Sequence, residues 1–334
     1  MSDSPALIAM TFSGGLGLAA YHAGVYQAFT TQGLPLHWVT GSSAGAITAA
    51  LIAGNGDENR FERLRAFWNF PPIEGGEPAP WPHLHGWIAA VGTRLVGSRG
   101  HFAPRFPAVD PFRFRSFYDL APMRERLTKL VDFGRLNSGE MRTCVATTNI
   151  ETGEPVIFDS SHVQLEIDHL MASCGFLPEF APVEIDGRLL GDGGLSLNAP
   201  FDPILEAESE RNLLLYVVDL YARDGQRPAS LEAAAERKRD LLFGNQTLVR
   251  LRYLSEVRRL RKQLSPRRVC RERSGPDCRP ELPSGSRRAR AGKILCALGG
   301  SAGAALARGR AGYGVRHLDR AGRRYQYRTA AARN

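Results

Sequence analysis

The five residues Gly41 to Gly45, of the form G-x-S-x-G, limit what this chain can fold into more than any other feature. Trp38, Val39 and Thr40 precede them with the character of a buried strand, and an Ala/Ile/Leu pattern typical of a helix follows. In such a strand–turn–helix the middle serine lies at the tip with its hydroxyl exposed, because small neighbours let the two backbones approach closely. Ser43 is therefore the candidate nucleophile, and the helix N-terminus beside it suits a developing oxyanion.

A second turn of the same kind, rich in glycine, lies near the N-terminus. Residues 6–12 (ALIAMTF) predict a buried parallel strand, and SGGLGLAAYHAGVYQAF continues with glycines and then a helix pattern. A dinucleotide site of the form G-x-G-x-x-G is disfavoured because Ala20 replaces its third glycine. We interpret the turn as an oxyanion hole, although the glycines could also form only a tight turn. The candidate N–H donors are Gly14, Gly15, Leu16 and Gly17.

A third glycine turn, LLGDGG at 189–194, places an acidic residue after a predicted strand end. Asp-Gly often does no more than start a turn, but Asp192 is also the candidate proton acceptor for Ser43. A histidine usually has that role, yet only His317 follows Asp192 in the chain order Ser, Asp, His. The sequence therefore predicts a Ser43–Asp192 dyad. The glycines that support the two turns are Gly41, Gly45, Gly193 and Gly194.

Together these motifs carry a family resemblance. FSGGLGLAAYHAGV at 12–25, TGSSAGAITAAL at 40–51 and GDGGLSLNAP at 191–200 resemble the patatin-like phospholipase family, over roughly residues 6–205 and more weakly to about 260. The resemblance implies an α/β fold with three α/β/α layers, a mostly parallel central sheet and the catalytic Ser/Asp dyad. It also implies a lipid acyl-ester hydrolase, either a phospholipase or a lipase, that needs neither a cofactor nor a metal.

One departure from the family pattern concerns the first glycine loop. Members usually show G-G-G-x-R/K-G, whereas this chain has Gly14, Gly15, Leu16, Gly17, Leu18 and Ala19. The missing basic residue would help to hold an anion, so a preference for phosphate is not implied. The alternative that this departure leaves open is a relative that binds lipid without turnover.

We expect three segments in the chain. Residues 1–205 form the catalytic core, interrupted at 60–119 by an irregular segment rich in Pro, Gly, Trp and Phe that either acts as a lid or packs against the body. Residues 206–264 supply a last strand and a C-terminal helical extension, and 265–334 form a basic Arg/Gly/Ala-rich tail. His83, His85 and His101 lack an acidic partner at metal-ligand spacing, so no metal site is expected.

The net charge of +9 is a property of the tail. Residues 261–334 hold 19 Lys/Arg and 4 Asp/Glu, whereas residues 1–260 hold 24 and 30. The composition of 265–334 predicts disorder. It also leaves open a basic arm for nucleic acid or anionic lipid, with nucleic acid disfavoured, or a segment translated out of frame.

The expected location is cytoplasmic, with peripheral contact at the inner membrane face as an option and a lipid or other acyl ester as the partner. Five cysteines without C-x-x-C spacing favour a reducing compartment. No basic segment precedes the first apolar run, so we expect no signal peptide. The longest weakly polar stretch of the tail, 294–307, is too short for a transmembrane helix, which needs about 20 residues.

Overall fold

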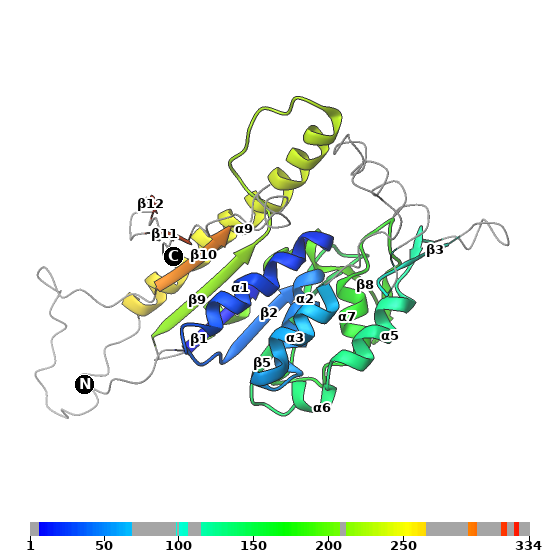
Figure 1. The fold of residues 1–334 in the computed structure, drawn as a ribbon. Helices are drawn as coiled ribbons and strands as arrows, with labels where there is room; N and C mark the ends of the chain where they lie inside the picture. The colour runs from blue at the N-terminus through cyan, green and yellow to red at the C-terminus, as the bar shows by residue number, and fades with distance from the viewer. Residues whose placement is uncertain are drawn as a thin grey trace, which may run out of the picture.

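The computed structural model describes residues 7–68, 98, 100–105, 115–207, 212–264, 293–298, 315–318 and 324–326. A sheet of ten strands forms the centre of this described part, in the order β12-β11-β10-β9-β1-β2-β5-β8-β7, with β6 paired to β5 (Figure 1). Its strands are β1 (Leu7–Phe12), β2 (Trp38–Ser42), β5 (Arg142–Asn149), β6 (Pro155–Asp159), β7 (Val183–Ile185), β8 (Arg188–Asp192), β9 (Leu213–Asp219), β10 (Lys293–Leu298), β11 (Val315–Leu318) and β12 (Arg324–Gln326). A separate pair consists of β3 (Ala103–Pro104) and β4 (Tyr118–Asp119).

The helices of the described part are α1 (Ala20–Thr30), α2 (Ala44–Ala53), α3 (Asp57–Trp68), α5 (Ala121–Leu130), α6 (Phe133–Leu136), α7 (Ile167–Ser173), α8 (Asp202–Glu206) and α9 (Leu231–Leu264). Two short 3₁₀ turns are present: Leu16–Ala19 lies in the glycine loop after β1, and Gly193–Leu195 follows β8 directly. None of the described helices is long and apolar enough to cross a membrane.

The middle of the sheet is parallel. β10, β9, β1, β2 and β5 run in one direction, and the antiparallel pairings involve the strands beyond β5 and β10. The carboxyl ends of parallel strands meet at one edge of a sheet, which is where α/β proteins place their ligand sites. Both predicted motif strands, β1 and β2, are neighbours in register there, with Phe12 opposite Gly41.

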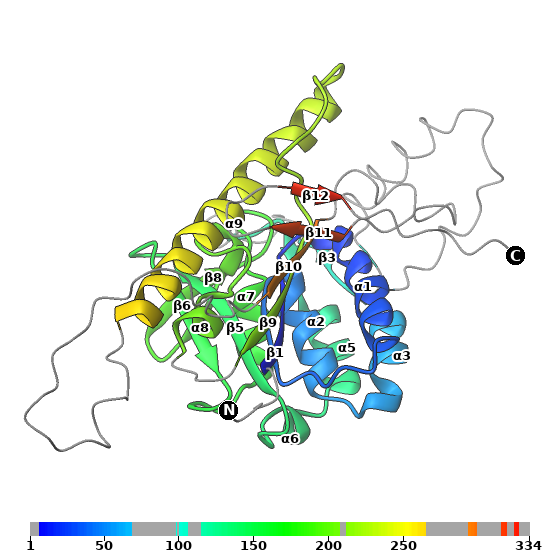
Figure 2. The same ribbon diagram turned by 90° about the vertical axis from the view of Figure 1, so that its left-hand side faces the viewer.

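Helices cover both faces of the sheet, as Figures 1 and 2 show. Alternate residues of β1 point to opposite faces: Met10 and Phe12 join a core cluster with α1, α2 and α3, whereas Ala9 joins a second cluster with α8 and α9. The three-layer α/β/α arrangement with a mostly parallel central sheet is therefore confirmed.

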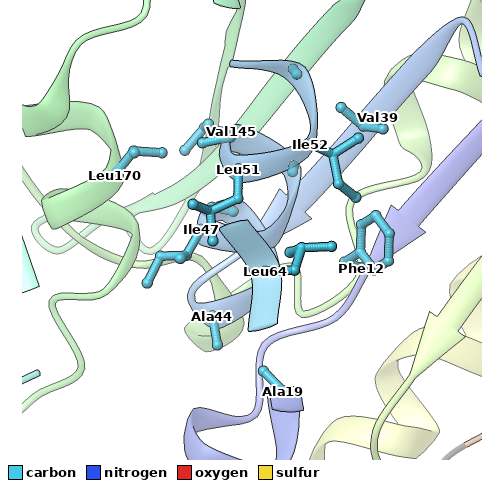
Figure 3. Packing of buried hydrophobic residues seen from close by; sticks show 14 of the residues in the cluster. Phe12, Ala19, Val39, Ala44, Ile47, Leu51, Ile52, Leu64, Val145 and Leu170 are labelled. Carbon is cyan, nitrogen blue, oxygen red and sulfur yellow. The ribbon is translucent and has the colours of Figure 1, made fainter. Parts of the chain in front are cut away.

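Helix α2 forms the centre of the larger core cluster. All ten of its residues are buried, which explains why its sequence is apolar on every side. Figure 3 shows Ile47 and Leu51 of this helix among Leu64, Val145 and Leu170, which come from three other elements. A helix packed on all sides holds the turn that precedes it in a fixed position.

The structure departs from the expected irregular segment at its start. Residues 60–68 belong to α3, so the prediction is wrong there: Leu64, Phe67 and Trp68 lie at helical spacing and are buried. The rest of this segment, at 69–97, 99 and 106–114, lies outside the described residues, and so do His83 and His85 within it. The division of the chain at residues 205 and 264 stays a prediction.

The tail contains three strands that its composition does not predict. β10 extends the sheet by pairing in parallel with β9, and β11 and β12 follow it antiparallel. The prediction of disorder is wrong for these three short segments. The remainder of 265–334 lies outside the described residues.

Candidate active site

Ser43 lies in a sharp turn between β2 and α2. Its backbone has φ 54° and ψ −125°, a conformation that L-residues other than glycine rarely adopt. Such local strain persists only where the surrounding structure enforces it, and it is concentrated at functional sites. The turn therefore has the geometry predicted for a nucleophile.

Two glycines let neighbouring backbone segments approach each other closely at this turn. A Cβ atom at Gly41 would lie 2.1 Å from the carbonyl oxygen of Gly45, and one at Gly45 would lie 2.1 Å from that of Phe12. Both distances are far below van der Waals contact with backbone atoms that cannot move aside. The supporting role predicted for Gly41 and Gly45 thus has a steric reason.

Substitution of Gly45 by alanine is expected to destabilise the fold. Because the new methyl group would overlap the β1 backbone, we expect the free energy of unfolding to fall by about 3 kcal/mol or more. Gly17→Ala is the matched control, since no atom lies within 4 Å of its added Cβ. Thermal unfolding followed by circular dichroism checks this, and equal midpoints for the two variants would contradict it.

Asp192, at the end of β8, faces Ser43 across the turn. The Ser43 hydroxyl donates a hydrogen bond of 2.6 Å to Asp192 Oδ2, and the N–H of Gly194 donates one of 2.7 Å to Oδ1. The hydroxyl of Thr148 on the neighbouring strand β5 donates to the Asp192 carbonyl at 2.8 Å. The structure thus brings together two residues that lie 149 positions apart in the chain.

Both members of this pair are buried. Ser43 is 5% exposed and Asp192 is 3% exposed. Burial raises the pKa of Asp192 from 3.8 to about 7, although the hydrogen bonds from Ser43 and Gly194 oppose the shift. A carboxyl group with a pKa near neutrality is suited to accept and return a proton during a reaction at neutral pH.

Ser173, at the end of α7, holds the backbone of Ser43. The N–H of Ser43 donates to Ser173 Oγ at 2.8 Å, and that hydroxyl donates to the carbonyl of Ala146 on β5 at 2.6 Å. The N–H of Ser43 therefore already has a hydrogen-bond acceptor within the protein. Sequence reasoning missed Ser173, because nothing in its local pattern marks a contact 130 positions away.

The glycine loop after β1 approaches the same serine. A Cβ atom at Gly14 would lie 3.0 Å from Ser43 Cβ, so glycine permits the close approach. The N–H of Gly14, however, donates to the carbonyl of Asn198 at 3.0 Å. The expectation that Gly14 supplies an oxyanion donor is therefore wrong, because this N–H already has an acceptor.

Four other N–H groups near Ser43 have no hydrogen-bond acceptor among the described residues. Three belong to the predicted loop, where Leu16 has a positive φ of 48°. The fourth is Ala44, the first residue of α2, which the sequence reasoning did not name although the residue after a nucleophile often contributes such a donor. These donors are Gly15, Leu16, Gly17 and Ala44.

An apolar cavity of about 90 Å³ opens onto Ser43. Leu16, Gly17 and Ala44 line it beside the serine. The remaining wall includes Ile47, Phe67, Trp68, Phe102, Met123 and Phe180. A second cavity, of about 230 Å³ and lined by Arg105 and Arg124 among others, includes neither Ser43 nor Asp192. The first cavity therefore combines the Ser43 hydroxyl with a surface suited to hydrocarbon.

No imidazole among the described residues is hydrogen-bonded to Ser43 or Asp192. The Nδ1 atom of His22 contacts Thr48 Oγ1 at 3.0 Å, and the Nε2 atom of His101 contacts the Phe67 carbonyl at 3.2 Å. His317 is on β11, which β10, β9 and β1 separate from β2. Four strand spacings amount to roughly 19 Å, which is beyond the reach of a histidine side chain.

No metal site is evident in the part of the chain that the structure describes. Within it, no three or more His, Cys, Asp or Glu side chains gather as metal ligands would. Cys174 lines the cavity, and burial raises its thiol pKa well above the usual value, so it is a packing residue there.

Comparisons with known proteins identify a family whose model matches more than half of the chain. A family model described as patatin-like phospholipase matches residues 10–205. A curated relative, the patatin-like phospholipase domain-containing protein ZK370.4 of Caenorhabditis elegans, is 26% identical over 195 residues, which are 58% of this chain and 12% of that protein. The chain thus spans a small part of the length of this relative.

Two solved structures are similar to this chain at lower sequence identity than the curated relative. VipD from Legionella pneumophila has a TM-score of 0.39 and 16% identity, covering 66% of this chain and 52% of that one. The ExoU–SpcU complex of the type III secretion system of Pseudomonas aeruginosa has a TM-score of 0.31 and 20% identity, covering 76% and 52%.

Proposed function

Since the chain belongs to the patatin-like phospholipase family, as its three motifs predicted, we propose that it is a serine hydrolase that cleaves fatty-acyl esters of lipids. Ser43 is the nucleophile and Asp192 its proton acceptor. The observation that carries the proposal is the 2.6 Å hydrogen bond from the Ser43 hydroxyl to Asp192 Oδ2, beside an apolar cavity.

The reaction proceeds in two halves. In the first, the Asp192 carboxylate takes the hydroxyl proton while Ser43 Oγ attacks the ester carbonyl carbon. The tetrahedral intermediate collapses, the C–O bond to the alcohol breaks, and Asp192 returns the proton to the departing alkoxide. In the second half, Asp192 removes a proton from water, which attacks the acyl-serine ester. Ser43 then recovers its proton and the fatty acid leaves.

Backbone N–H groups stabilise the negative charge that develops on the carbonyl oxygen in both halves. Their positions are fixed before the reaction, so no reorganisation is needed when the charge appears. Ala44 adds the positive end of the α2 dipole. We assign this role to Gly15, Leu16, Gly17 and Ala44, whose N–H groups have no acceptor among the described residues.

The residues around the serine favour an acyl chain in the cavity. The cavity wall is aliphatic and aromatic, and Phe67 makes edge contacts with Trp68 and His101 that hold it in place. Leu18, at 48% exposure, stands where the family pattern usually has a basic residue, and Leu16, at 55% exposure, stands where it has a third glycine. The loop therefore offers apolar surface instead of a charge for a phosphate head group, so neutral esters should be accepted.

The pH dependence of hydrolysis tests the role of Asp192. Because the carboxyl group must be ionised to accept the proton, kcat/KM should rise with pH through an apparent pKa near 7. Initial rates on p-nitrophenyl butyrate in a series of buffers give the profile. A profile with no inflection between weakly acidic and weakly alkaline pH would contradict the proposal.

Asp219 provides the control for this profile. It ends β9, it is 1% exposed, and burial raises its pKa to about 7 as well. Its side chain accepts the N–H of Tyr221 at 3.1 Å and makes no contact with Ser43. The inflection should persist in Asp219→Asn. If it disappears in that variant, the inflection belongs to Asp219 and not to Asp192.

A second candidate function is lipid binding without turnover. Two observations favour it: the loop lacks the basic residue found in relatives, and the Gly14 N–H is already bonded to Asn198. This alternative predicts that the purified chain binds lipid vesicles but neither hydrolyses esters nor reacts at Ser43 with a fluorophosphonate.

A further inference from the structure

The outer side of α9 carries a line of exposed apolar side chains. Leu242 is 57% exposed, Val249 65%, Tyr253 66% and Leu260 42%. We call these four residues the α9 stripe. Their spacings of seven, four and seven residues place them within about 20° of one line along the helix, over roughly 27 Å. They therefore form one continuous surface.

This surface faces away from the body of the protein. Thr247, Leu251 and Leu254, on the opposite side of α9, are buried, and the two leucines pack with residues of α8 and β9. Figures 1 and 2 show α9 along the sheet face opposite α1 and α3, with its first turns extending beyond the sheet. The fold that buries one side of α9 thus leaves the stripe uncovered by the described residues.

Two contacts fix α9 close to the catalytic residues. The N–H of Asn198 donates to Gln246 Oε1 at 2.8 Å, and Arg250 is paired with Asp202 of α8. A Cβ atom at Gly194, the residue that donates to Asp192, would lie 3.7 Å from the ring of Phe243 on α9. The part of α9 at the Leu242 end of the stripe therefore lies beside the loop that follows Asp192.

Positive charge borders the stripe on both sides. Helix α9 contains nine Lys/Arg and four Asp/Glu. Lys238 and Arg252 lie on one flank and Arg239 on the other, and all three are exposed without an ion-pair partner among the described residues. The acidic residue nearest the line, Glu256, is neutralised by Arg259. The border is thus suited to an anionic partner.

A second copy of the helix would fit this surface poorly. A coiled-coil seam along the stripe would also include positions 239, 246 and 256, which are Arg, Gln and Glu. An apolar line bordered by exposed cations is instead the pattern of helices that lie in the interface of anionic lipid. We propose that the α9 stripe docks the protein on an anionic lipid surface, with Leu242, Val249, Tyr253 and Leu260 inserted and the flanking cations at the head groups.

This inference rests on the proposed function in one respect: docking is useful to the protein because it would bring lipid esters to the Ser43 cavity. The binding step itself can be measured without turnover. The full-length Ser43→Ala protein and its Val249→Ser/Tyr253→Ser derivative are compared by flotation with vesicles of phosphatidylcholine alone and of phosphatidylcholine mixed with phosphatidylserine. The double substitution leaves every charge in place, so the electrostatic attraction of the basic tail is the same in both proteins.

We expect the Ser43→Ala protein to bind the mixed vesicles and the double substitution to weaken that binding about tenfold or more, because exposed apolar area is lost. Val163→Ser, at a 41% exposed valine between β6 and α7, is the control and should bind as before. Undiminished binding by the stripe variant would overturn the inference, as would equal binding to vesicles without phosphatidylserine. A change in molar mass by light scattering in the stripe variant would assign the stripe to self-association and would overturn it too.

Turnover of p-nitrophenyl butyrate separates this inference from the proposed function. In the Ser43 background, the stripe variant should hydrolyse this soluble ester as fast as the wild type, since none of the four stripe residues lines the cavity. If the wild type binds mixed vesicles but hydrolyses no ester, the function fails while the docking surface stands. A stripe variant that loses soluble-ester turnover would contradict the separate docking role.

Discussion

Replacement of Ser43 by alanine is expected to lower kcat/KM for ester hydrolysis by about a thousandfold or more. The substitution removes the oxygen that forms the acyl-enzyme while leaving the backbone donors and the cavity intact. The strained turn is enforced by close packing around Gly41 and Gly45, so the fold should remain. Hydrolysis of p-nitrophenyl butyrate by the purified variant measures the loss.

The neighbouring serine offers a matched control for this substitution. Ser42, the last residue of β2, is fully buried, and its hydroxyl has no hydrogen-bond partner among the described residues. Removal of that hydroxyl in Ser42→Ala should leave activity within a few-fold of the wild type. Activity that survives Ser43→Ala, or that depends equally on Ser42, would exclude Ser43 as the nucleophile.

Substitution of Asp192 by asparagine should cause a comparable loss of activity. The amide can still accept the N–H of Gly194 but cannot take the proton of Ser43 Oγ, so kcat should fall by at least about a thousandfold. His317→Gln is the comparison, because β11 is too far from β2 for an imidazole to reach the serine. Loss of activity in His317→Gln with activity retained in Asp192→Asn would instead favour a histidine base.

The same aspartate variant should be more stable at alkaline pH. Since the folded pKa of Asp192 is raised from 3.8 to about 7, the unfolded chain ionises first as pH rises, and stability is lost progressively between these values. Above pH 7 the wild type retains a buried charge that asparagine avoids. Asp192→Asn should therefore melt several degrees higher than the wild type at alkaline pH, and the difference should shrink towards pH 4.

Local motifs were sufficient to predict that Ser43 and Asp192 lie together, but not the groups around them. Ser43 follows β2 within the pattern G-x-S-x-G, and Asp192 ends β8 before two glycines; both patterns can be read from short windows of sequence. Ser173, by contrast, contributes through a bond to a residue 130 positions away. The Gly14 N–H is not available as an oxyanion donor because it donates to the carbonyl of Asn198, which only the folded chain brings near.

The errors in predicting the fold have different physical causes. In α3 the signal was present, because Leu64, Phe67 and Trp68 lie at helical spacing after the acidic first turn of Asp57 and Glu58. The Pro- and Gly-rich sequence that follows obscured it. In the tail, the five apolar residues that follow Lys293 in β10 are stabilised by pairing with β9 rather than by local propensity. The flanking composition therefore gave no indication of a strand.

The most direct test of the Ser43–Asp192 dyad is the rate at which a fluorophosphonate reacts with the protein, with the labelled residue identified by peptide mass spectrometry. The geometry predicts label on Ser43, with a rate that falls at least about a hundredfold in Asp192→Asn and is unchanged in His317→Gln. Label on another residue, or equal rates in the wild type and Asp192→Asn, would contradict the direct activation of Ser43 by Asp192.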